Sequence, residues 1–138
     1  MGKQNKGMGI PNPQVNIDTN IKFSFRYYDT SCSKYCISEW GKEAISFALK
    51  RLQDISTKKF KEIVGNRVYH FFPVYWEQTI KKGGFPTQEA NRLDAYHFAL
   101  VGLNNQKARV YGAYAEGTFY IIWFDFNHEI WPTFPRNS

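Results

Sequence analysis

The sequence predicts an α+β domain in which an antiparallel sheet of four or five strands carries two N-terminal helices on one face. Three observations predict it. Residues 21–29 (IKFSFRYYD) alternate apolar and polar side chains with the period of a half-buried strand. Residues 38–56 change to a helical period, and residues 67–125 are rich in β-branched and aromatic runs separated by turn residues. The expected order is β-α-α-β-β-β, within one domain over residues 21–138.

Residues 1–20 are rich in Gly, Asn, Gln and Pro and have no periodicity, which is typical of a flexible N-terminal tail. The tail lacks the apolar core of a secretory signal, and Lys6 stands where a myristoylation signal needs Ser or Thr. No stretch approaches the roughly 18 apolar residues of a membrane span. These features predict a cytoplasmic protein with no membrane partner.

The first predicted helix lies within residues 38–56 and has Ser38 as its candidate N-cap. The residues expected on its inner face recur at helical spacing and are Ala44, Ile45, Ala48, Leu49 and Leu52. A second, shorter helix follows within residues 56–66 and ends at Gly65 in the C′ position. Its inner face is expected to comprise Phe60, Ile63 and Val64.

The remaining elements are strands and loops. Pro73 places the β-rich run at residues 67–76 at a sheet edge, or splits it. Residues 77–94 form a long loop that can hold a helical turn, and residues 95–103 form a strand followed by a turn at NNQK. The last element is a hairpin around the short connection AEG, in which residues 109–114 pair with residues 119–125.

The formal net charge of +6 favours a polyanionic partner, with nucleic acid first. The lysines form two clusters, and the alternative is that both are simply solvated faces. The clusters are Lys58, Lys59 and Lys61, and Lys81 and Lys82. Cys32 and Cys36 are expected to be reduced thiols rather than half of a metal site, because no second pair completes it.

No nucleotide-binding, zinc-protease or serine-hydrolase motif appears in the chain. The candidate chemistry therefore rests on polar residues at strand ends: Arg109 and His128, with Glu77 and His97 upstream. In the predicted hairpin the start of one strand lies beside the end of the other, so Arg109 and His128 should be neighbours. Such a pair suits phosphate chemistry, because Arg neutralises the phosphate while His moves a proton.

Each of these residues also has a structural alternative. His128 could cap the strand end through a backbone carbonyl. His97 could be a half-buried side chain on its strand. Trp131 could stack on a base or pack over the sheet edge. Arg109 could pair across the hairpin with Asp125 or Glu116.

The segment ARVYGAYAEGTFYIIWFDFNHEIWP, residues 108–132, resembles the C-terminal hairpin of RelE/ParE-type bacterial toxins. In that hairpin an Arg opens a strand, a short acidic or glycine turn follows, and the next strand ends in a His shortly before an aromatic residue. The chain also looks like an uncharacterised bacterial family with the C-terminal pattern F-Y-x-x-W-x-D-x-N-H, which supplies no function. The chain departs from the toxin pattern in its long loop at 77–94 and in having Trp131 where Tyr is expected.

The toxin resemblance implies a RelE-like fold and a metal-independent, cofactor-independent endoribonuclease that cleaves mRNA, with ribosome dependence as an option and an antitoxin as protein partner. Arg109 would stabilise the phosphorane, His128 would protonate the 5′-oxygen leaving group, and Glu77 would be the base. RNA would be held by Lys58, Lys59, Lys61, Lys81, Lys82 and Trp131. The alternative is a non-catalytic module that binds nucleic acid or protein through its basic surface.

Overall fold

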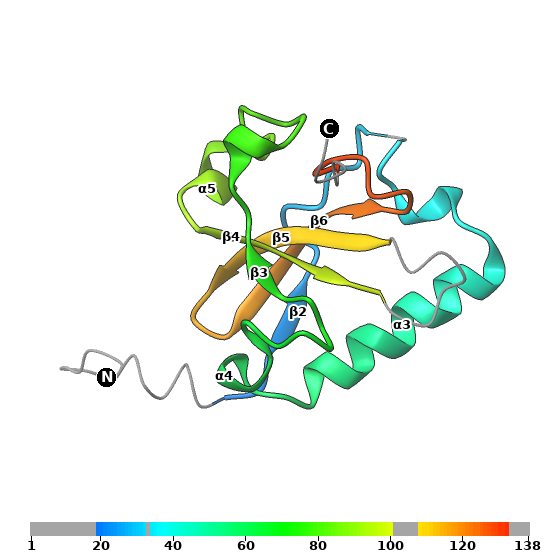
Figure 1. Cartoon of the computed structure of the whole chain (residues 1–138), viewed down its shortest axis with the longest axis vertical. Coiled ribbons are helices and arrows are strands. Elements are labelled where there is room, and N and C mark those ends of the chain that lie inside the picture. Colours follow the sequence, from blue (N-terminus) through cyan, green and yellow to red (C-terminus); the bar gives the residue numbers. More distant parts are fainter. Residues whose placement is uncertain (1–18, 33, 101–107, 133–138) are drawn as a thin grey trace, which may run out of the picture.

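The computed structural model describes residues 19–32, 34–100 and 108–132, which form an α+β fold around one five-stranded sheet (Figure 1). The tail predicted at residues 1–20 and the turn predicted at NNQK lie almost wholly outside the described residues. The strands, in the spatial order β2-β6-β5-β4-β3, are β2 (Lys22–Ser24), β6 (Thr118–Asp125), β5 (Arg109–Ala115), β4 (Asp94–Ala99) and β3 (Phe72–Pro73). The helices are α3 (Lys42–Ser56), α4 (Phe60–Ile63) and α5 (Gln88–Asn91), with 3-10 turns η1 (Ile37–Glu39) and η2 (Trp76–Gln78).

The sheet is mixed, so the prediction of a purely antiparallel sheet is wrong. Three strand pairs are antiparallel, but β2 runs parallel to β6, with Phe23 opposite Phe119. The backbone N–H of Lys22 bonds to the carbonyl of Gly117, so β2 begins at the hairpin turn and follows β6 away from it. Alternating apolar residues place a strand's buried face but not its direction, because both directions present the same faces.

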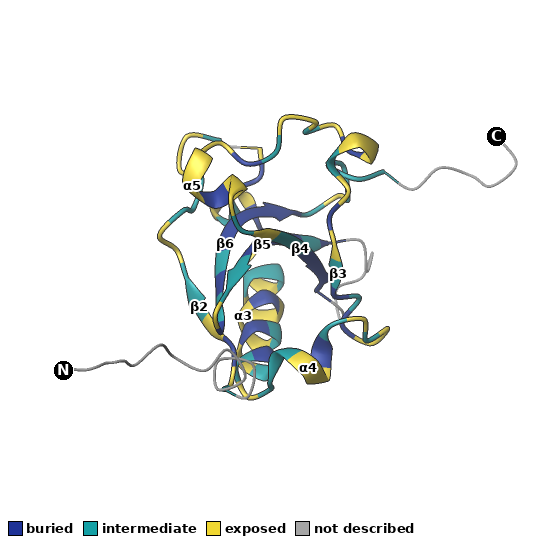
Figure 2. Cartoon of the chain, turned by 90° about the vertical axis from the view of Figure 1, so that its left-hand side faces the viewer, coloured by how far each residue is buried: buried dark blue, intermediate teal, exposed yellow. Residues whose placement is uncertain are grey.

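One face of the sheet is covered by α3 and α4, as predicted (Figure 2). From α3, Ala48, Leu52 and Ile55 are buried in this core. Ala44 and Ile45 pack against it at the edge. Leu49 is 58% exposed, so its assignment to the inner face is wrong. The apolar stripe drifts along the helix, and Ile55, one turn beyond the predicted set, takes the buried place.

The start of α3 also differs from the prediction. The residue before Lys42 is Gly41, which has an extended backbone and makes no side-chain cap. Ser38 instead lies in η1, where its hydroxyl is 3.1 Å from the sulfur of Cys36. The predicted end of the second helix is confirmed, because Gly65 follows α4 with φ at 74°.

The other face of the sheet carries a second core, which is closed by η2, α5 and the C-terminal turn (Figure 2). Its buried members include Tyr111, Trp123 and Ile130. Lys81 lies over this core, with its ammonium 5.0 Å from the ring centre of Trp123. The loop predicted at 77–94 is therefore a packed cover of this face rather than a free insertion.

The predicted hairpin is confirmed. Strands β5 and β6 pair from Arg109 opposite Asp125 to Ala115 opposite Thr118, through a two-residue turn with positive φ at Glu116 and Gly117. The register shifts between Tyr111 and Gly112, which leaves one extra residue on β6. This β-bulge re-aims the end of β6.

As a result of the bulge, Ile122 and Trp123 are both buried in the second core, although they are neighbours in sequence. Gly112 is required there, since a Cβ would collide with the carbonyl oxygen of Tyr120. Beyond the bulge, Asp125 lies opposite Arg109, at the end of the sheet where the candidate site lies.

Candidate functional site

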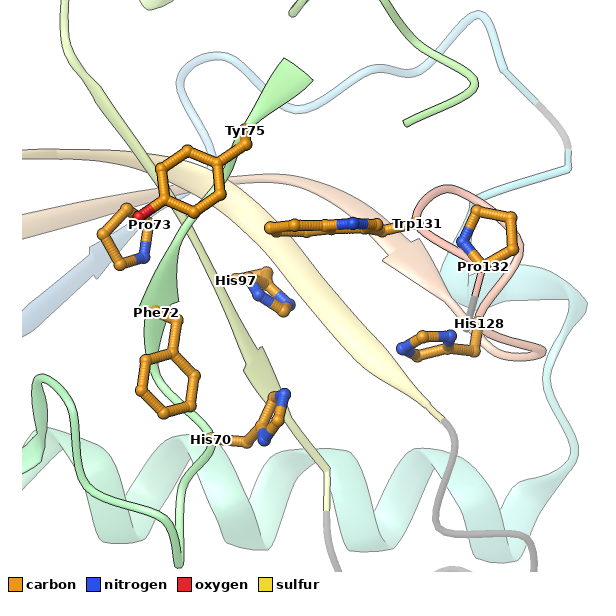
Figure 3. Close-up of a pocket in the computed structure, with 8 residues that line it drawn as sticks. All are labelled: His70, Phe72, Pro73, Tyr75, His97, His128, Trp131 and Pro132. Atoms are coloured by element: carbon orange, nitrogen blue, oxygen red, sulfur yellow. The ribbon is translucent and has the colours of Figure 1, made fainter. Parts of the chain in front are cut away.

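All three histidines of the chain line one hollow of about 410 Å³ over the second face of the sheet (Figure 3). We call it the histidine pocket. They reach it from three separate elements: the loop before β3, strand β4, and the turn after β6. The complete lining is His70, Phe72, Pro73, Tyr75, His97, His128, Trp131 and Pro132.

His97 lies on β4 between Phe72 of β3 and Tyr111 of β5 and is only 4% exposed, so it is more deeply buried than predicted. Its ring stacks on Tyr111 at 5.3 Å and meets Trp131 at 5.0 Å. Burial, assisted by the neighbouring positive charges, lowers the pKa of His97 to about 3. His97 is therefore neutral at physiological pH.

His70 is the functional candidate that the sequence did not reveal. It precedes β3 with φ at 52°, and its backbone N–H donates to the carbonyl of Asn66. Its ring lies 5.6 Å from that of His97 and nearly perpendicular to it. Burial, and then the charge of Arg109, lower its pKa. In the sequence it is one more aromatic in VYHFF, and no spacing marks it.

His128 is held in place by a buried carboxylate. The side chain of Asp125 accepts hydrogen bonds from the backbone N–H groups of Glu129 at 2.9 Å and Ile130 at 2.7 Å. These two bonds close the turn in which His128 takes φ of 60°. Burial raises the pKa of Asp125. The imidazole of His128 is partly exposed and extends over the pocket from this turn (Figure 3).

Arg109 opens β5 directly opposite Asp125, and the charges of these two residues interact. This arrangement agrees with the alternative of a cross-hairpin partner at Asp125, whereas Glu116 lies at the far, turn end of the hairpin. Arg109 also acts on the pocket. The positive charge of Arg109 lowers the pKa of both His70 and His97, and the charge of His128 also lowers the pKa of His97. Arg109 and His128 therefore both lie near enough to His97 to act on its pKa, and of these two residues His128 is the one that lines the pocket.

Glu77 lies apart from this group. It is exposed in η2 and lines a second hollow, of about 470 Å³, which Lys82 also lines. Trp131 and Pro132 border both hollows, so the two adjoin there. The structure does not bring Glu77 among the residues that line the histidine pocket, which removes the geometric support for it as the base.

The lysines fall into two places. Lys58, Lys59 and Lys61 surround the start of α4, and the carbonyl of Lys58 accepts from Ile21 at the start of β2. That is the turn end of the hairpin, about 20 Å from Arg109 at roughly 3.3 Å per strand residue. Lys82 lines the hollow that adjoins the histidine pocket.

Three further findings concern the described residues. The thiols of Cys32 and Cys36 are free, and that of Cys36 accepts a hydrogen bond from the Tyr28 hydroxyl. In the described part of the chain, no group of three or more His, Cys, Asp or Glu side chains is arranged to hold a metal ion. Among the same residues, no helix has the length and apolar character needed to cross a membrane.

The chain was compared with protein-family models, with curated proteins and with solved structures, and it matches none of them. The resemblance to RelE/ParE-type toxins therefore stays a prediction from the sequence pattern.

Proposed function

We propose that the protein is a toxin-like endoribonuclease that cleaves RNA without a metal ion, at the histidine pocket. The observation that carries the proposal is the convergence of three histidines on one aromatic-walled hollow, with Arg109 near enough for its charge to lower the pKa of two of them. Two imidazoles and a guanidinium are sufficient for general acid–base cleavage of a phosphodiester bond that has a neighbouring hydroxyl.

In the proposed reaction His70 is the general base. Its lowered pKa keeps it neutral at physiological pH, so it can accept the proton of the ribose 2′-OH. The 2′-oxygen then bonds to the adjacent phosphorus, and Arg109 stabilises the negative charge of the phosphorane. As the bond from phosphorus to the 5′-oxygen breaks, His128 donates a proton to that oxygen. The products carry a 2′,3′-cyclic phosphate and a 5′-hydroxyl.

His70 replaces Glu77 in this scheme because it lines the same pocket as His128, whereas Glu77 does not. His97 is unsuited to either proton transfer. With a pKa of about 3, it is too weak a base to take a proton from a hydroxyl near neutral pH.

The cellular setting rests on the sequence resemblance. A bacterial cytoplasmic location, a ribosome-bound mRNA substrate and an antitoxin partner belong to this proposal on that ground alone. Induction of the protein in a bacterial host, with growth and total RNA followed, tests them. Arrested growth with RNA cleavage is expected, and both effects should disappear in His128→Ala.

The chemistry itself is tested with the purified full chain, single-stranded RNA and a metal chelator. Wild type should cleave, while His70→Gln, His128→Ala and Arg109→Ala should each lose about 100-fold or more of the rate. Arg67→Ala is the matched control, because Arg67 is exposed and close in sequence to His70. Cleavage that survives in all three variants, or that the chelator abolishes, would refute the proposal.

The alternative is a non-catalytic module that binds nucleic acid or protein. Two features favour this alternative as much as they favour the endoribonuclease. One is the basic surface, and the other is Tyr75, an aromatic side chain beside the pocket that is 52% exposed. Salt-sensitive RNA binding without cleavage in the same experiment would select this alternative.

A further inference from the structure

The histidine pocket contains a buried polar group that is not explained by the fold. His97 is only 4% exposed, and within the described part of the chain its Nδ1 has no hydrogen-bond partner. Burying a polar atom without a partner is unfavourable, so such a group in a native site calls for one. Because His97 lines the pocket, a ligand that displaces the side chains covering Nδ1 can supply that partner.

The surroundings of His97 determine how it can meet a ligand. Tyr111 stacks on its ring with an interplanar angle of 16°, and Trp131 lies 5.0 Å away on a 44° tilt. The ring is therefore packed between aromatic neighbours, and its nitrogen-bearing edge is the part that can hydrogen-bond a ligand. A neutral imidazole offers one donor and one acceptor along that edge.

The walls of the pocket favour a flat, aromatic ligand. Phe72, Tyr75 and Trp131 surround the space, and Tyr75 meets Trp131 edge to face at 79° (Figure 3). Bases of single-stranded nucleic acids stack on such rings whatever their sequence. The volume of about 410 Å³ lies near the lower end of the range for small-molecule sites, about 300 to 1,000 Å³, which suits a single nucleotide.

We propose that the histidine pocket binds one nucleobase of a single-stranded RNA, and that the imidazole edge of His97 selects the base by hydrogen bonding. This inference rests on the proposed function and deepens it. His97 becomes a specificity residue, while His70 and His128 transfer protons. The cleavage it implies is base-selective, because a site with a buried polar group rejects ligands that leave that group unpaired.

The test separates base selection from cleavage by using ligands that cannot be cleaved. AMP, GMP, CMP and UMP are titrated into the full chain by calorimetry, and the cleavage sites in a mixed-sequence RNA are mapped in parallel. One or two of the four nucleotides should bind about tenfold or more tighter than the others, the factor expected when a buried hydrogen bond cannot form. The same bases should flank the cleavage sites.

His97→Phe keeps an aromatic ring of similar size and removes the hydrogen-bonding edge. The four affinities should become equal within about threefold, and cleavage should lose its base preference. Arg67→Ala, at an exposed position outside the residues that line the pocket, is the matched control: it should retain both the nucleotide preference and the cleavage of the wild type. His97→Gln, which restores a donor and an acceptor, should recover part of the preference.

A measurement on the wild type covers the case in which the variants do not fold. The ¹⁵N resonances of the His97 ring should shift when the preferred nucleotide is added, and not with the disfavoured ones. Equal binding of all four nucleotides, no binding, an unshifted His97 ring, or a preference that survives in His97→Phe would each overturn the inference. Cleavage lost in His70→Gln and His128→Ala would still leave the proposed function standing. A base preference without any cleavage would overturn the proposed function alone.

Discussion

The backbone N–H of Ile130 donates a 2.7 Å hydrogen bond to the buried carboxylate of Asp125. Together with the bond from Glu129, it closes the turn that presents His128 to the pocket. Asp125 also lies opposite Arg109 on β5. One buried carboxylate at the end of β6 therefore holds the turn of His128 and lies opposite Arg109 on the neighbouring strand.

Asp125→Asn tests this role. An amide has a single acceptor oxygen, so one of the two N–H groups should lose its partner, at a cost of about 1 to 3 kcal/mol in the free energy of unfolding. RNA cleavage should fall as well, because His128 loses its support. Asp94→Asn, at an exposed position on β4, is the matched control and should change stability by no more than about 0.5 kcal/mol. Urea denaturation measures the stability of both variants, and an Asp125→Asn protein as stable as the wild type would contradict the account.

Gly112 is predicted to be indispensable to the bulge in the hairpin. A methyl group there would collide with the carbonyl oxygen of Tyr120 and the ring of Phe119. Gly112→Ala should therefore destabilise the protein by about 2 kcal/mol or more. Gly83→Ala has open space around its Cβ and should be neutral or stabilising by up to about 1 kcal/mol. Equal melting temperatures for the two variants would show that the bulge is not as described.

Stability should fall as pH is lowered, in part because of His97. Its pKa is about 6.5 in the unfolded chain and about 3 in the fold, so between these values the unfolded state binds the extra proton. The contribution of His97 to the free energy of unfolding is fully present above its pKa in the unfolded chain, and it is lost as pH falls toward its pKa in the folded protein. The loss from about pH 7 to about pH 4 should be roughly 3 kcal/mol.

His97→Phe serves as the reference for this pH dependence, because phenylalanine does not titrate. Burial raises the pKa of Asp125, which acts in the opposite direction, but this contribution is common to both proteins and cancels in the difference. The unfolding free energy of His97→Phe should vary less steeply over the same range. Parallel curves of unfolding free energy against pH for the wild type and the variant would mean that His97 titrates normally in the folded protein.

RNA affinity should fall steeply with salt if it comes from binding to phosphates. Lys82 is a predicted lysine near the pocket, since it lines the adjoining hollow. Lys82→Glu should weaken binding and reduce the slope of log K against log salt by about 0.7 for each phosphate that the protein no longer neutralises. Lys50→Glu, on the exposed side of α3, makes the same charge change away from the pocket and should weaken binding less.

Replacing Lys58, Lys59 and Lys61 together should have an effect on RNA affinity between those of Lys82→Glu and Lys50→Glu. These lysines lie at the far end of the sheet, so their replacement by Glu should reduce affinity for long RNA but not for a dinucleotide. Fluorescence anisotropy with a long RNA and with a dinucleotide measures the two affinities. An affinity indifferent to salt would point instead to a protein or small-molecule partner.

The hairpin follows directly from the sequence, because apolar runs stand on both sides of a short turn and predict two paired strands. The start of β5 must then lie near the end of β6, which is why the sequence predicts Arg109 and His128 as neighbours. The register that places Arg109 opposite Asp125 also depends on the bulge, which adds one residue to β6 and has no mark in the sequence pattern. The alternating pattern of residues 21–29 could not give the direction of β2, because a strand presents the same side chains to the core in either direction.

The rest of the site depends on packing between segments distant in sequence. His70 reaches the pocket through a positive φ in the loop before β3, and no local pattern marks it. His97 is buried because the C-terminal turn brings Trp131 over it, which a strand pattern alone does not reveal. Glu77 was chosen for its place near a strand, and η2 directs it into the adjoining hollow instead.

The central claim is that the histidine pocket cleaves RNA by attack of the ribose 2′-OH. The most direct measurement uses a DNA oligonucleotide with a single ribonucleotide, incubated with the full chain in the presence of a metal chelator. With oligonucleotides that carry each of the four bases at this position, the account predicts cleavage only on the 3′ side of the ribonucleotide. It predicts a 2′,3′-cyclic phosphate product, and none from His70→Gln or His128→Ala. Cleavage at deoxynucleotides, or cleavage that persists in both variants, would contradict it.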